Sequence, residues 1–145
     1  MRRTLAVLTF TALAFTATAC GGDDDEGSNT NSEITKADFI VSANAICVAG
    51  DERAEGFTEP TTEDEAVDLI VNEVLPNISD QIAQIRDIGF PEGDEDELGA
   101  ILDDADAVIA DINADPEAFL TDENPFGEIN DALNEYGVTE CADAS

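Results

Sequence analysis

Apolar residues recur at helical spacing along most of the chain after residue 34, and no stretch alternates between apolar and polar residues as a strand would. Each such segment therefore predicts an amphipathic helix with one buried face. The connections between the segments are short, as expected of helices that pack antiparallel to their neighbours. The sequence predicts an all-α domain over residues 34–145, a small antiparallel bundle of about four main helices with one disulfide.

Two capping-box patterns predict where helices begin. Thr35 and Asp38 precede a helical period that predicts a first helix over about residues 36–56. Thr62 and Glu65 repeat the pattern before a second period. In a capping box, the hydroxyl accepts a hydrogen bond from the third helical N–H, and the carboxylate accepts one from the N–H of the cap residue.

The second period continues to Gly89 but contains a proline. Pro76 lacks a backbone N–H, so we expect a kink or a break near Leu75, with Pro76 beginning a second segment. Gly89 suits a left-handed helix end before the next proline.

Two further helices are predicted towards the C-terminus. The apolar positions from 98 to 112 define a third helix that ends before Pro116. A short turn and a loop lead to a last helix over about residues 126–136, which Gly137 ends.

The first twenty residues are typical of a bacterial lipoprotein signal. Arg2 and Arg3 precede an apolar stretch too short to span a bilayer, and small residues come before Cys20. We expect residues 1–19 to be removed and Cys20 to carry lipid. Ala17 stands where such signals usually have Leu, and an ordinary secretory signal or an uncleaved helix remains an alternative.

Residues 20–33 are rich in Gly, Ser, Asn and acids and have no apolar side chain other than the cysteine before residue 33. Such a composition predicts a flexible tether that spans on the order of 20 Å or more. The domain should therefore be held at the extracytoplasmic face of the cell membrane by the lipid on Cys20.

The chain has 5 basic and 35 acidic residues, a formal net charge of −30. So large a negative charge excludes nucleic acid as a direct partner. Adaptation to high salt, or a generally acidic exported surface, is one explanation of the charge. A protein partner with a basic surface is the other, and its binding should weaken as salt rises.

Three cysteines remain to be assigned. If Cys20 carries lipid, Cys47 and Cys141 are left as a pair in an oxidising compartment. A disulfide closing a loop of about 95 residues would stabilise the fold by roughly 4 to 5 kcal/mol. Two free, buried thiols are the alternative.

The residue types argue against an enzyme and predict no cofactor. The chain has no His and no Trp, and no Ser or Cys stands in a nucleophile setting. The acids between Asp111 and Asp115 match the start of an EF-hand, but Pro116 occupies the position that requires glycine. We therefore predict no dedicated metal site; weak Ca²⁺ or Mg²⁺ binding by residues 92–97 or 103–111 is the alternative function.

Residues 37–47, the ending from Tyr136 to Cys141 and the leader around Cys20 together resemble small exported lipoproteins of actinobacteria. The resemblance implies a helical extracytoplasmic domain in which Cys47 pairs with Cys141, and it implies no biochemical activity. With the composition, it favours a non-enzymatic, lipid-anchored binding or envelope-associated protein.

Overall fold

A computed structural model describes residues 34–121 and 124–142. The predicted signal of residues 1–19, the lipid site Cys20 and the tether up to residue 33 lie outside the described residues. The described residues are helical, with turns and irregular connections and no strand among them. The elements are α1 (Lys36–Ala54), α2 (Glu63–Leu69), the π-helical turn η1 (Ile70–Val74), α3 (Leu75–Ile88), α4 (Glu95–Ala114), α5 (Pro116–Phe119) and α6 (Gly127–Tyr136).

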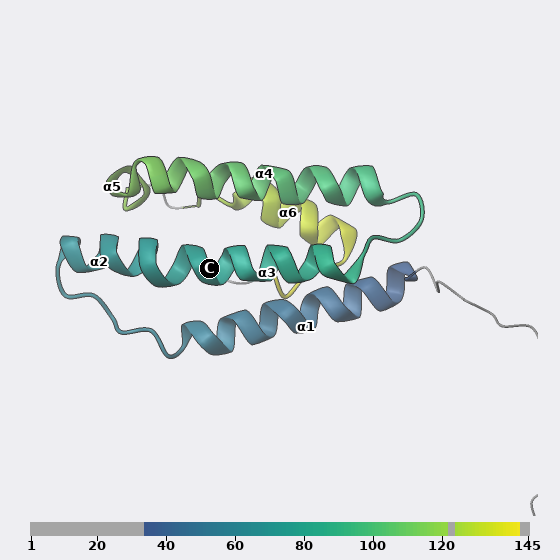
Figure 1. Ribbon diagram of the computed structural model, residues 1–145, viewed down its shortest axis with the longest axis horizontal. Coiled ribbons are helices and arrows are strands. Elements are labelled where there is room, and N and C mark those ends of the chain that lie inside the picture. Colours follow the sequence, from purple (N-terminus) through teal and green to yellow (C-terminus); the bar gives the residue numbers. More distant parts are fainter. Residues whose placement is uncertain (1–33, 122–123, 143–145) are drawn as a thin grey trace, which may run out of the picture. The chain divides into compact units, whose positions relative to one another are not determined.

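The long helices run antiparallel, as predicted (Figure 1). α1 packs on α3, α3 on α4, and α4 on α6. Gly50 lies at the first of these contacts, and a methyl group there would come within 2.2 Å of the end of the Gln81 side chain, which would have to move. The Gly50 carbonyl also accepts a hydrogen bond of 3.0 Å from the Asn77 side-chain amide on α3.

Both predicted helix starts are confirmed, but the carboxylates do not accept the hydrogen bond that a capping box predicts. Thr35 Oγ1 accepts the Asp38 N–H at 3.2 Å, and the Thr35 hydroxyl, not its N–H, donates to the Asp38 carboxylate at 2.7 Å. Thr62 Oγ1 accepts the Glu65 N–H at 3.2 Å, as a capping box requires. The Glu65 carboxylate, however, accepts from the N–H and the hydroxyl of Thr61, at 2.8 and 2.7 Å, and not from Thr62. These hydrogen bonds from Thr61 lower the pKa of Glu65.

The irregularity expected near Leu75 is present as one widened turn, whereas the expected kink or break is not: the helical pattern continues from α2 through η1 into α3. The Leu75 N–H bonds to the Ile70 carbonyl, five residues back, and Pro76 follows at the start of α3. Because Pro76 has no N–H, the regular four-residue pattern cannot pass through it, and the wider turn takes up the irregularity. α2 and α3 consequently continue in one line (Figure 1).

The two predicted glycine helix ends differ from each other. Gly137 is left-handed, with φ of 112° and ψ of 5°, and the Val138 N–H returns to the Leu133 carbonyl at 2.8 Å. Gly89 has a positive φ of 79°, but its ψ of 157° is extended. The expectation of a left-handed end at Gly89 is therefore wrong: the chain leaves α3 extended towards Pro91.

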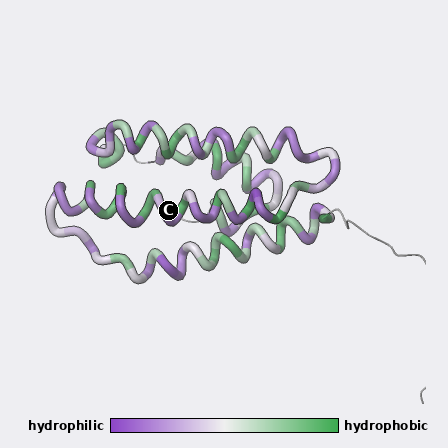
Figure 2. Tube along the Cα trace, in the orientation of Figure 1, coloured by the Kyte–Doolittle hydropathy of each residue, from purple (hydrophilic) through white to green (hydrophobic). Residues whose placement is uncertain are grey.

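The core is made of apolar side chains from α1, η1, α3, α4 and α6 and of Val138, and no polar or charged residue in the described part is buried apart from the ring of Tyr136. Figure 2 shows that hydrophobic and hydrophilic positions both recur along the long helices. Phe39 lies at the centre of the core, with its ring edge-to-face against those of Phe90 and Tyr136, at centroid distances of 6.0 and 5.9 Å. The buried apolar residues are Phe39, Ala43, Cys47, Ile70, Leu75, Ile82, Ile85, Leu98, Ile101, Leu102, Ala105, Ile109, Ile112, Ile129, Leu133, Tyr136 and Val138.

Candidate functional site

The predicted bond between Cys47 and Cys141 is present, and their Cα atoms lie 5.0 Å apart. Cys47 is on the buried face of α1, and Cys141 follows α6. The Glu140 N–H donates to Asn44 on α1 at 3.0 Å, which holds the C-terminal segment beside that helix. The alternative of two free thiols is wrong.

Two of the cations in the described part of the chain connect α1 to other helices. The Lys36 ammonium lies 3.7 Å from the centre of the Tyr136 ring on α6. Arg53 donates from Nε to the Asn77 side-chain oxygen on α3 at 2.8 Å. Both positive charges are thereby used between helices of the same domain.

The third cation in the described residues, Arg86, connects α3 to α4. Its guanidinium donates to Asp103 at 2.8 Å and to Asp106 at 2.7 Å. Hydrogen bonding to Asp106 is the main cause that raises the pKa of Arg86, so the guanidinium stays charged. Asp103 and Asp106 are therefore neutralised within the fold.

The acidic turn before α4 is also partly engaged. The Tyr136 hydroxyl donates to Asp94 at 2.5 Å, and the Gly93 N–H donates to Glu95 at 2.7 Å. Burial, and then the Asp94 carboxylate, raise the pKa of Tyr136 above its ordinary value. Asp94 therefore has a structural role, which disfavours residues 92–97 as a cation site.

No group of three or more Cys, Asp or Glu side chains in the described residues is arranged to hold a metal ion. Asp111 lies in the last turn of α4, and Asp115 caps α5 by accepting the Ala118 N–H at 3.2 Å. A helix in place of a loop at Asp111 excludes the EF-hand arrangement at this position.

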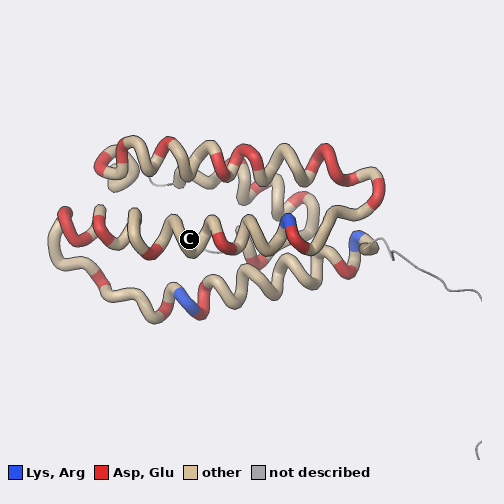
Figure 3. Tube along the Cα trace, viewed as in Figure 1, with Lys and Arg blue, Asp and Glu red and all other residues tan. Residues whose placement is uncertain are grey.

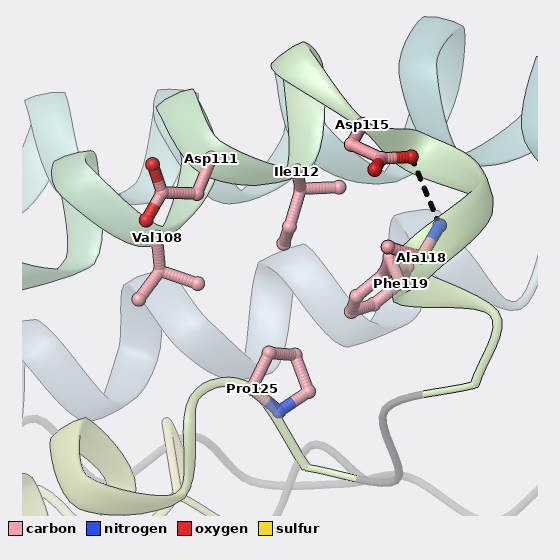
Figure 4. A pocket seen from close by; sticks show the side chains of 7 residues that line it. All are labelled: Val108, Asp111, Ile112, Asp115, Ala118, Phe119 and Pro125. Carbon is pink, nitrogen blue, oxygen red and sulfur yellow. Dashed lines mark hydrogen bonds between the residues drawn. The ribbon is translucent and has the colours of Figure 1, made fainter.

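A hollow of about 300 Å³ lies between α4, α5 and the segment before α6 (Figure 4). Apolar groups form its floor and walls, with Val108 and Ile112 of α4 opposite Pro125 (Figure 4). Asp111 of α4 and Asp115, between α4 and α5, lie along its edge (Figure 4). The hollow thus combines an apolar floor with a carboxylate rim.

A second hollow of about 500 Å³ shares Val108 and Pro125 with the first. It continues along α4 past Asp104 to Ile101, and Glu128 of α6 lies on its other side. We call the two together the α4 groove, lined by Ile101, Asp104, Val108, Asp111, Ile112, Asp115, Ala118, Phe119, Asn124, Pro125, Glu128, Ile129 and Ala132.

The sequence indicated the acids of this groove only as possible cation ligands and did not indicate its apolar floor. One signal was present: Asp104 and Asp111 stand seven residues apart with Val108 between them, a spacing that places all three on one side of a helix. The sequence alone could not show that α5 and the segment before α6 would complete the groove.

Comparison of the chain with models of protein families, with curated protein sequences and with solved structures gave no match. Among the residues that the structure describes, no helix is both long enough and apolar enough to cross a membrane.

Proposed function

We propose that this chain is a lipid-anchored, extracytoplasmic protein without enzymatic activity, and that it binds a protein partner with a basic surface. The observation that carries the proposal is that the basic side chains of the described residues all bind groups within the domain. Lys36, Arg53 and Arg86 each connect two helices of the domain, so most acids outside these contacts have no positive neighbour.

The resulting distribution of charge can be followed in Figure 3. Acidic residues occur along the length of α4 and on α2 and α3, whereas the few basic positions are isolated. Such a surface attracts basic partners over distances set by the ionic strength and repels acidic ones. The partner should therefore carry an excess of Lys and Arg where it meets this domain.

The anchor on Cys20 remains a prediction from the leader. The disulfide between Cys47 and Cys141 supports it, because such bonds persist in oxidising, extracytoplasmic compartments. The absence of enzymatic activity is proposed because the chain has no His, and because no carboxylate in the described part is buried to serve as a general acid.

Zero-length coupling of carboxylates to amines on intact cells tests the proposal. The chain supplies many carboxylates, and its single lysine, Lys36, is held over Tyr136, so the partner must supply the amines. We expect the captured protein to be extracytoplasmic and rich in Lys and Arg. Captured proteins with no excess of basic residues would contradict the proposal.

A further inference from the structure

We propose that the α4 groove is the docking site for this partner, and that the segment bound there is a cationic amphipathic helix. The inference rests on the proposed function and gives the partner's binding segment a definite chemistry. A second copy of this chain is a poor occupant, because each copy carries a formal charge of −30 and the rim of the groove is acidic.

The length of the groove fits a short helix. Its wall extends along α4 from Ile101 to Asp115, the residue that follows the helix. These fourteen steps along the chain span about 21 Å at 1.5 Å per residue. A partner helix of about four turns covers that length. Its apolar side chains would contact Val108 and Phe119, as in other complexes in which one helix lies in an apolar groove.

The carboxylates of α4 that follow its first turn fall into two sets. Asp103 and Asp106 are held by Arg86 of α3. Asp104 and Asp111 line the groove instead, and neither of their carboxylates forms a hydrogen bond or an ion pair with another described residue. One set of charges is thus paired with a cation of the same domain at its surface, and the other is available to a ligand in the groove.

The spacing of the available set defines what the partner must present. Asp104 and Asp111 are seven residues apart, which is about 10 Å along the helix axis. Two Lys or Arg residues seven positions apart on a partner helix have the same spacing, whether that helix lies parallel or antiparallel to α4. Apolar residues three and four positions after the first of these basic residues lie between the two and face the floor of the groove.

A designed peptide tests the inference. It is an amphipathic helix of about four turns, with Lys pairs seven residues apart, Leu on the intervening face and one Trp. The full chain is reconstituted in phosphatidylcholine vesicles, and empty vesicles give the background. Because the chain has no Trp, tryptophan emission reports the peptide alone.

Two double variants, each of which replaces two Asp residues seven positions apart, are compared. Asp104→Asn with Asp111→Asn removes two charges from the groove, whereas Asp80→Asn with Asp87→Asn removes two exposed charges seven residues apart on α3. We expect the groove pair to weaken binding about 5-fold and the α3 pair less than about 2-fold. Equal weakening by both pairs would refute the groove as the docking site, although it would still agree with a basic partner.

Changes in the peptide test the groove without altering the protein. Replacing its Leu by Ser retains the charge and should abolish saturable binding, because the apolar floor then has no ligand. Unchanged binding of that peptide would overturn the inference while agreeing with a basic partner. Failure of coupling to capture any basic protein, by contrast, would refute the proposed function itself.

Discussion

The hydroxyl of Tyr136 donates a hydrogen bond to Asp94, 42 residues earlier in the chain. Lys36, the first residue of α1, lies over the same ring, and Phe39 packs against its edge. One side chain therefore joins the start of α1, the loop before α4 and the end of α6. Its titration reports whether these three segments stay together.

Tyr136 should resist ionisation for as long as the protein is folded. Its pKa is raised in the fold, so its contribution to stability is complete below the ordinary value of 10.0 and is lost as pH rises through the folded-state pKa. It is the only Tyr, and no Trp interferes with its ultraviolet absorbance. We expect absorbance and helicity to change together at alkaline pH. Reversible ionisation near pH 10.0 with full helicity would show that the bond to Asp94 is absent.

Reduction of the disulfide should destabilise the domain strongly. The bond joins residues 94 apart, and releasing such a loop lowers the free energy of unfolding by about 4 to 5 kcal/mol in the chain-entropy model. Urea unfolding with and without reductant measures the difference. Alkylation of the folded protein without reductant is the control, and a label on Cys47 or Cys141 would contradict the bond.

Loss of Arg86 should cost more than loss of Arg53. Arg86→Gln leaves Asp103 and Asp106 facing each other without a cation, and we expect about 1 kcal/mol lower unfolding free energy. Arg53→Gln removes the same charge but only one hydrogen bond to a neutral amide. The difference between the two variants should shrink in high salt. Equal effects at all salt concentrations would show that the contact between α3 and α4 adds nothing.

Replacement of Cys20 by Ala tests the anchor. Because lipid attachment requires the thiol, we expect the variant to appear in the medium or to accumulate as precursor. Cell fractionation with an antibody to the domain measures this, and Asp80→Asn, a change at an exposed position that keeps Cys20 and the disulfide, is the control. Retention of mature Cys20→Ala protein in the membrane would contradict the lipid anchor.

The helices and the disulfide were predictable because each depends on local pattern or on simple cysteine counting. Apolar spacing, capping residues and Pro76 define the helices to within a few residues, and Cys47 and Cys141 are the pair left when Cys20 is assigned to lipid. The ψ angle of Gly89 was not predictable, because it depends on where the following segment must go.

The charges could not be assigned to partners in the same way. Asp103 and Asp104 are adjacent and chemically identical, yet one pairs with Arg86 and the other lines the α4 groove. The difference depends on how α4 is rotated against α3, which only the packed structure defines. The groove was missed for the same reason, because Phe119 and Pro125 reach it from separate segments.

Dependence on ionic strength tests the central claim, a basic partner held by an acidic surface, most directly. Carboxylate-to-amine coupling on intact cells is repeated from about 0.01 M to about 1 M salt, over which the Debye length falls from about 30 Å to about 3 Å. We predict that capture of the basic partner falls steeply across this range. Capture that is unchanged by salt, or no capture at the lowest salt, would contradict the account.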